Sequence, residues 1–379
     1  MNIIDRYKNQ RVSQVIHYQN RAQGEQQYRV ENCHRLKTKR AHQVSLRKKE
    51  GSARANYGDI QTCGSVHACT VCASVISERR CQFVQAAIDS WRNLCCESSV
   101  YLVTFTTPHY IFQTLRDVLD IQDRAFRIMR KQPQKRVPYK VWSTIMAEMG
   151  FIGSISARET TFGGNGWHPH RHELVFGLKA DLEEIQGWRS DLVRAFAIAF
   201  EKAGGCIKDP AAFHRRSVKI DQIHEQDNGY NRVSHYLTDI EGEKWTIAQE
   251  TTKGAVKVGK KGNITPFGML EAIRQGAEHS RLYSAKFFEF ARTMHGKKQL
   301  WPTPGLNKIL SLVSWKPDSE IIKESAAGHH YSFLSDHEWN QINQFDIRGE
   351  ILAMTENKNE FEFMTELNNL LKTYHQECA

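Results

Sequence analysis

Three histidines at alternate positions constrain how this chain can fold more than any other feature of the sequence. His168, His170 and His172 stand in the segment HPHRHEL, where the chain enters an apolar run typical of a strand. Side chains two positions apart on a strand point to the same face, so His170 and His172 can present two imidazoles to one ion. Imidazole is the commonest metal ligand in proteins. The spacing therefore predicts a metal site on one face of a sheet.

A carboxylate on the preceding segment can complete this site. Glu159 lies in SARETTF, across the turn GGNGW from the histidines, and we expect it to pair alongside them as a third ligand. Two histidines and one carboxylate leave coordination positions open for water and a phosphate oxygen, which suits Mn²⁺ or Mg²⁺ in phosphoryl transfer. The competing interpretation is a chance cluster on a turn, because the chain has 17 histidines.

The surrounding segments alternate between strand and helix patterns. Strand segments are rich in β-branched and aromatic residues, and helical segments repeat apolar residues every three to four positions. This order predicts an α+β fold, an antiparallel sheet with helices packed on one face. The strand segments are SVYLVTFTT, FIGSISARETTF, HELVFGL and SVKIDQI, the turn between the second and third is GGNGWHP, and the helices cover about 114–131 and 182–203.

Cysteines near the start of the chain have the spacing of a second metal site. Cys69 and Cys72 form a CxxC pair, and Cys63 precedes it by six residues. Thiolates at this spacing can wrap a tetrahedral zinc ion, with a fourth ligand supplied by Cys33 or by His67, of which we prefer Cys33. The alternative is that these cysteines are free thiols in a packed helix.

Composition limits the partners and the compartment. The chain has a net charge of +10 and a calculated pI of about 9.1, which favours phosphate-rich partners such as nucleic acid. The polar N-terminus MNIIDRYKNQR lacks the apolar segment of a signal peptide, and no stretch is apolar enough to span a membrane. We therefore expect a cytoplasmic protein without a membrane partner, in which nine cysteines serve as metal ligands and thiols rather than as a disulfide framework.

The segment RETTFGGNGWHPHRHELV, residues 158–175, resembles the metal-binding motif of the HUH endonucleases. It is most similar to replication initiators of rolling-circle plasmids in the broad pUB110 and pC194 class, and TFTTP, residues 104–108, resembles their first motif. The resemblance implies an HUH palm in which His170 and His172 are paired ligands, Glu159 is the third, and His168 is an accessory member. Arg171 departs from the family, which has a bulky apolar residue there.

The resemblance also points to a nucleophile among the twelve tyrosines. A phenolate can form a covalent link to DNA that conserves the energy of the broken bond. Tyr236, in NGYNRVSHYLTDIEGE, matches the family's catalytic tyrosine, and Tyr230 is the alternative. The family's glutamate four residues before the tyrosine and lysine three after it are replaced by Arg232 and Asp239. We hypothesise that Arg232 stabilises the phenolate or the phosphate and that Asp239 takes the role of the acid.

Further segments extend the resemblance from Cys63 to about Leu310. They are KKGNITPFGMLEAI, QLWPTPGLNKIL and the cysteine run CGSVHACTVCASVISERR. The chain is accordingly expected to contain a basic N-terminal arm (1–55), a cysteine-rich zinc-binding module (56–97), an HUH endonuclease catalytic domain (98–280) and a helical C-terminal region (281–379).

The implied function is nicking of plasmid origin DNA, leaving a 5′-phosphotyrosyl link and a 3′-hydroxyl that primes a host polymerase. The origin would be single-stranded or extruded as a hairpin at the nick. From charge and position, and not from the resemblance, we expect the N-terminal arm to bind origin DNA and the C-terminal region to recruit a helicase or form a homodimer. The alternatives are an HUH transposase or relaxase and, in a different class, a non-catalytic zinc-containing DNA-binding regulator.

Overall fold

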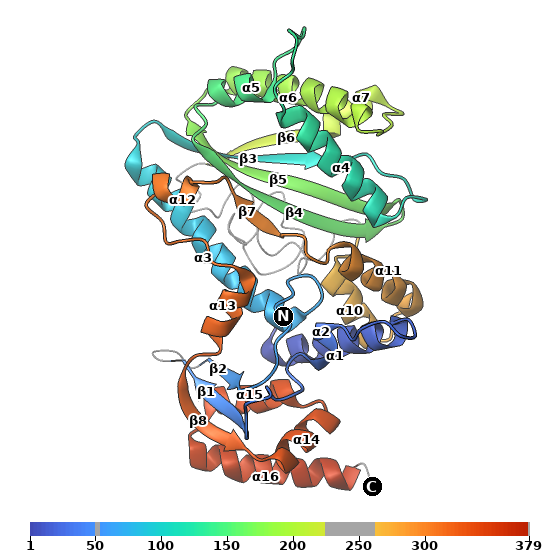
Figure 1. The fold of residues 1–379 in the computed structure, drawn as a ribbon, viewed down its shortest axis with the longest axis vertical. Coiled ribbons are helices and arrows are strands. Elements are labelled where there is room, and N and C mark those ends of the chain that lie inside the picture. The colour runs from blue at the N-terminus through green and yellow to red at the C-terminus, as the bar shows by residue number, and fades with distance from the viewer. Residues whose placement is uncertain (50–53, 224–261, 378–379) are drawn as a thin grey trace. The chain divides into compact units, whose positions relative to one another are not determined.

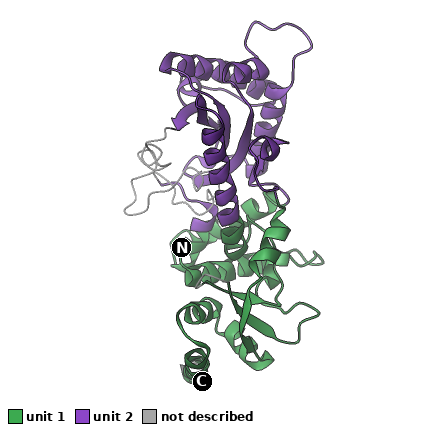
Figure 2. Ribbon diagram, turned by 90° about the vertical axis from the view of Figure 1, so that its left-hand side faces the viewer, with its two compact units in different colours: residues 1–76, 269–295, 316–379 green, residues 77–268, 296–315 purple. Residues whose placement is uncertain are grey.

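The fold was obtained as a computed structural model (Figure 1), and it forms two compact units (Figure 2). The residues described are 1–49, 54–223 and 262–377. Unit 1 contains residues 1–76, 269–295 and 316–379, and unit 2 contains residues 77–268 and 296–315. Each unit combines helices with an antiparallel sheet, so the predicted α+β class is confirmed. Both units are assembled from separate stretches of the chain, whereas the predicted segments are contiguous.

The sheet of unit 2 has five strands in the order β6-β3-β5-β4-β7, and each neighbouring pair is antiparallel. Helix α3 is divided between the two units at Ile76, and helix α10 at Gly268. The elements of this part of the chain are α3 (Thr70–Leu94), β3 (Ser98–Thr106), α4 (Leu115–Arg130), α5 (Trp142–Glu148), β4 (Gly153–Gly163), β5 (Gly166–Leu178), α6 (Leu182–Lys202), α7 (Pro210–Arg216), β6 (Val218–Ile223), α10 (Pro266–Arg274), β7 (Leu300–Pro302) and α12 (Leu306–Ile309).

One face of this sheet packs against α4, α5, α6 and α7 (Figure 1). Alternate residues of β3, such as Tyr101 and Phe105, point into this layer together with Val175 of β5. Helix α4 begins where the sequence predicts, because Thr114 and Asp117 form reciprocal hydrogen bonds between side chain and backbone that cap its first turn. The predicted helix over 182–203 is likewise confirmed as α6.

Helices pack on both faces of the sheet, whereas the sequence predicted helices on one face only. Helix α3 packs on the opposite face, where Val84 and Ile88 meet Leu102 and Leu174. The indole nitrogen of Trp91 donates to the carbonyl oxygens of Ser99 and Gly177, which ties this helix to two strands. The sequence places this helix in a separate cysteine-rich module (56–97). Its own periodicity does not indicate that it packs against the sheet.

The β4–β5 hairpin is longer than predicted. Its strands pair from Gly153↔Phe176 to Gly163↔Gly166, so only Gly164 and Asn165 separate them. His168, predicted to lie in the turn, instead lies within β5, opposite Thr161. Gly166 has φ +89°, a conformation that glycine adopts without strain, and this allows the tight connection.

Unit 1 contains the N-terminal and C-terminal parts of the chain. Residues 1–55, expected to be a basic arm, instead include the partly buried helix α1 and the paired strand β1. The region 281–379 is helical for much of its length but also contains β7 and β8. The elements are α1 (Ile3–Asn20), α2 (Arg29–Asn32), β1 (Val44–Lys48), β2 (Ala55–Gly58), α11 (Ser280–Thr293), α13 (Asp318–Ser325), β8 (His329–Leu334), α14 (Asp336–Gln344), α15 (Arg348–Asn357) and α16 (Glu360–Glu377), with sheet order β2-β1-β8.

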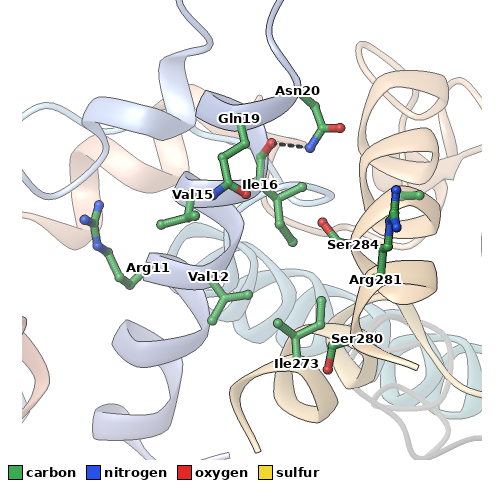
Figure 3. A pocket seen from close by; sticks show the side chains of 11 residues that line it. Arg11, Val12, Val15, Ile16, Gln19, Asn20, Ile273, Ser280, Arg281 and Ser284 are labelled. Atoms are coloured by element: carbon green, nitrogen blue, oxygen red, sulfur yellow. Dashed lines mark hydrogen bonds between the residues drawn. The ribbon is translucent and has the colours of Figure 1, made fainter. Parts of the chain in front are cut away.

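A pocket of about 660 Å³ lies in unit 1 between α1 and the helices α10 and α11 (Figure 3). Arg11 and Arg281 lie on its opposite sides, and apolar side chains such as Val12 and Ile273 form much of the wall. The lining contains no histidine, cysteine or carboxylate, so it offers no metal ligand and no acid–base group. The pocket is therefore separate from the predicted histidine and cysteine sites.

None of the helices in the described ranges combines the length and the apolar character that crossing a bilayer requires.

Candidate active site and cysteine cluster

The polar end of the α3-facing side of the sheet carries the predicted histidines and glutamate. Glu159 of β4 lies opposite His170 of β5, as the sequence analysis expected. A carboxylate oxygen of Glu159 is 3.0 Å from Nε2 of His172. Both side chains are largely buried. The three proposed ligands are therefore neighbours on one face of two paired strands.

Two threonines of β3 contact the rings of the paired histidines. The hydroxyl oxygen of Thr104 is 3.0 Å from Nδ1 of His172, and that of Thr106 is 3.1 Å from Nδ1 of His170. Because Nδ1 is engaged in each ring, Nε2 is the nitrogen that would coordinate a metal ion. Nδ1 would then carry the proton and donate it to the hydroxyl, the arrangement by which outer partners orient metal-bound histidines. The sequence analysis singled out TFTTP as a motif but not these two roles.

His168 and His109 continue the row of imidazoles. The ring centroids of His168 and His170 are 4.2 Å apart, and those of His109 and His168 are 4.6 Å apart. Burial, with a smaller contribution from the neighbouring His109, lowers the pKa of His168 to about 4. Burial also lowers the pKa of His109. Both rings are therefore neutral at neutral pH. His109 was not among the predicted site residues, although it directly follows the TFTTP motif.

The proposed ligands are one carboxylate and two imidazoles whose Nδ1 atoms are engaged. These donor types can bind a divalent cation. The ligand atoms of the histidines and Glu159 are farther apart than those of the four cysteines described below. Among the described residues, only those cysteines form a group of three or more whose ligand atoms all lie within 4.8 Å of one another.

A buried ionic network lies on the other face of the same strands. Glu173 is fully buried and accepts hydrogen bonds from Arg171 (Nε to Oε1, 2.7 Å) and Arg130 (Nη2 to Oε1, 2.5 Å). The hydroxyl of Ser156 donates to its second oxygen at 2.7 Å. The guanidinium of Arg171 also lies 4.1 Å from the ring centroid of Phe126. The unusual Arg171 is thus accommodated by a counter-charge two residues along its own strand, and this face of β5 is buried.

Four buried cysteines converge in unit 1. Cys33 Sγ lies 3.7 Å from Cys69 Sγ and 3.6 Å from Cys72 Sγ, and Cys63 Sγ lies 3.8 Å from Cys72 Sγ. A tetrahedral zinc ion with Zn–S bonds of about 2.3 Å would separate its sulfurs by about 3.8 Å. The spacing matches, so these four residues could bind zinc. Of the two candidates for the fourth ligand, Cys33 lies in the cluster with the other three cysteines. The ring of His67 packs edge-on against Phe290.

Polar groups around the cysteines favour bound thiolates. Gln10 of α1 donates its amide to Cys69 Sγ at 3.1 Å, and the backbone N–H of Cys63 donates to Cys33 Sγ at 3.2 Å. Burial raises the pKa of the Cys33 thiol, whereas hydrogen bonds from the neighbouring cysteines lower the pKa of Cys72. Four thiolates buried together would need a cation to offset their charge, and a zinc ion could supply it.

The predicted nucleophile lies outside the described residues. Tyr236, the alternative Tyr230, and the flanking Arg232 and Asp239 all fall within residues 224–261. The chain that follows is described: Ile264 exchanges two backbone hydrogen bonds with Phe162 of β4, at 2.8 and 2.9 Å. Ile264, in the segment that resembles the family downstream of its tyrosine, therefore pairs with the strand that carries Glu159.

Comparison with known proteins finds two curated relatives from Streptomyces. The chain is 25% identical over 308 residues to "Protein rep" of Streptomyces lividans, covering 67% of this chain and 64% of that protein. It is 31% identical over 131 residues to a "Neomycin resistance protein" of Streptomyces cyanogenus, covering 30% of each. The chain thus spans less than two thirds of the length of either relative. No family profile and no solved structure matches the chain.

Proposed function

We propose that this protein initiates rolling-circle replication of a plasmid by nicking one strand of the origin with a tyrosine. The similarity to Protein rep supports a plasmid replication protein. The observation that carries the nicking activity is the placement of His170, His172 and Glu159 on one face, with a threonine hydroxyl at Nδ1 of each histidine. This arrangement suits a divalent cation that contacts a phosphodiester.

The three ligands and the tyrosine divide the chemistry between them. When bound, Mn²⁺ or Mg²⁺ would polarise an oxygen of the scissile phosphate. Tyr236 is the nucleophile: its phenolate oxygen bonds to phosphorus as the bond from phosphorus to the 3′ oxygen breaks, and the 3′ oxygen takes up a proton. The products are a 5′-phosphotyrosyl link and a 3′-hydroxyl that primes the host polymerase. Rejoining is the reverse of this step.

Charged neighbours of Tyr236 complete the proposal. An unperturbed phenol ionises near pKa 10, so a nearby cation is needed for reactivity at neutral pH. We assign that part to Arg232, and to Asp239 the activation of the water that ends replication. Recruitment of a host helicase and formation of a homodimer belong to the same proposal.

The test is covalent capture of DNA. The protein is incubated with a labelled single-stranded origin oligonucleotide and Mn²⁺ and then run on a denaturing protein gel. We expect an adduct that disappears in Tyr236→Phe and in His172→Ala but persists in Tyr230→Phe. An adduct that survives Tyr236→Phe and is lost in Tyr230→Phe would move the nucleophile to Tyr230.

The same experiment separates the other functions. Binding of duplex DNA without any metal-dependent adduct, for all origin-derived strands, would favour a non-catalytic zinc-containing regulator. An adduct that forms on transposon ends or on a transfer origin, but not on a replication origin, would favour a transposase or a relaxase.

We further propose that Cys33, Cys63, Cys69 and Cys72 hold a structural zinc ion. The tetrahedral spacing of the sulfurs and the hydrogen bonds that they accept support this assignment. The ion would join segments that are far apart in sequence, and it would have no part in the nicking reaction.

A further inference from the structure

The loop between β3 and α4 exposes large apolar side chains. Ile111 is 72% exposed and Phe112 is 76% exposed. The ring of Phe112 stacks on that of Tyr110, with centroids 5.7 Å apart and an interplanar angle of 3°. Exposed apolar groups that lie next to one another, unlike scattered ones, indicate a binding surface. We call Tyr110, Ile111 and Phe112 the aromatic platform.

The platform is held in place by its neighbours. Gln113 accepts the backbone N–H of Tyr110 through its side chain at 2.8 Å and donates its own backbone N–H to the carbonyl of Tyr110 at 2.9 Å. The hydroxyl of Tyr110 donates to the carbonyl of Cys206 at 3.1 Å. The β4–β5 turn also supports the loop, because a Cβ at Gly166 would lie 3.1 Å from the Cα of Ile111. These contacts hold the backbone of the loop and the side chain of Tyr110 in place.

The platform is continuous with the candidate active site. His109 directly precedes Tyr110, and its ring centroid lies 4.6 Å from that of His168, which in turn lies beside the proposed ligand His170. A positive charge also lies beside the platform, because Nζ of Lys208 is 4.3 Å from the centroid of the Tyr110 ring. Stacked rings beside a cation are the features by which proteins bind single strands: bases stack on the aromatic faces while cations meet the phosphates.

We propose that the aromatic platform binds bases of single-stranded DNA and leads that strand to the candidate metal site. This inference rests on the proposed function, which supplies single-stranded DNA as the substrate. Unpaired bases offer two open faces for stacking, whereas the bases of a duplex are covered by their neighbours. Stacking tolerates any base, so the platform would position the strand without reading its sequence.

The test measures stacking directly and without cleavage. A single-stranded oligonucleotide of about 12 nucleotides, within the usual site size for such proteins, carries 2-aminopurine at successive positions and is mixed with the full chain in EDTA. We expect 2-aminopurine fluorescence to be quenched at one or more positions by the wild type and by Phe112→Tyr. Phe112→Ala should lose this quenching and bind the strand about tenfold more weakly, the usual effect of removing one stacking ring.

Phe361→Ala is the matched control, because Phe361 is 83% exposed on α16 and lies outside the platform. It should quench and bind like the wild type, and affinity for duplex DNA should be equal in all four proteins. Unchanged quenching and unchanged affinity for the single strand in Phe112→Ala would overturn the inference. It would also be overturned if Phe112→Ala reduced association between copies of the protein but left DNA binding unchanged. The proposed nicking requires a metal ion, so EDTA would prevent it and the quenching experiment would measure DNA binding alone. Failure of the proposed function would show separately, as absence of the covalent adduct with Mn²⁺.

Discussion

The hydroxyl oxygen of Thr104 lies 3.0 Å from Nδ1 of His172, across the β3–β5 ladder that also places Thr106 beside His170. Strand β3 thus orients the two proposed ligands that its neighbour β5 carries. The register of the sheet, rather than any single motif, brings the parts of the site together.

The threonines should tune metal binding. We expect the double substitution Thr104→Val and Thr106→Val to weaken Mn²⁺ binding about 10- to 100-fold, because the histidine rings lose the partners that fix their orientation and their Nδ1 protons. Titration calorimetry measures the affinity. The double substitution to serine keeps both hydroxyls and should bind Mn²⁺ like the wild type. Equal affinity of the valine and serine proteins would contradict the assigned role.

The buried ion network should contribute strongly to stability. Replacing Glu173 with Gln leaves the buried guanidinium of Arg171 without its counter-charge, and breaking a buried pair in this way costs about 3–5 kcal/mol. Urea unfolding measures the loss. The control is Glu201→Gln on the exposed surface of α6, for which we expect a change within about 0.5 kcal/mol. A loss for Glu173→Gln no greater than that of the control would show that the network is not stabilising.

Stability should also fall in acid through the same carboxylate. Burial by itself raises the pKa of Glu173, but Arg130 and Arg171 outweigh it and hold that pKa below its ordinary value. A lowered pKa in the folded state contributes stability that is fully present above the unfolded value of about 4.3 and is lost as the pH falls through the folded value. The urea midpoint of the wild type should therefore drop more steeply below pH 4.3 than that of Glu173→Gln, and parallel curves would refute this.

The cysteine cluster should hold one zinc ion per chain, and Cys33 should be required for it. Elemental analysis of the purified protein measures the metal. We expect Cys33→Ser to lose the ion, because the site needs four ligands, and His67→Ala and Cys96→Ser to keep it. Retention of zinc in Cys33→Ser together with its loss in His67→Ala would reverse the choice of the fourth ligand.

Local patterns predicted much of the sheet and its helices correctly. The predicted strand at 99–107 is β3, and SVKIDQI contains β6. The helix caps at Thr114 and Asp181 are also local signals. These features could be predicted because periodicity and capping depend on residues within one or two turns of each other.

Other elements could not be predicted because their signals are short or unusual. Strand β7 has only three residues, too few for any alternation to be read. Helix α1 was read as polar because its buried face carries amides and hydroxyls: Gln14 donates to the carbonyls of Val30 and Cys33, and Ser13 donates to that of Ala68. A buried polar face of this kind looks solvent-exposed until its hydrogen-bond partners are known.

The sequence by itself determined which chemistry the chain can offer: alternating histidines that share one face, a carboxylate one hairpin strand away, and a CxxC pair. The tertiary structure decided which groups meet them. Thr104 lies 68 residues from His172, and Cys33 lies 36 residues from Cys69. Pairings at such separations depend on strand register and on the packing of distant segments, which the local periodicity of a sequence does not encode.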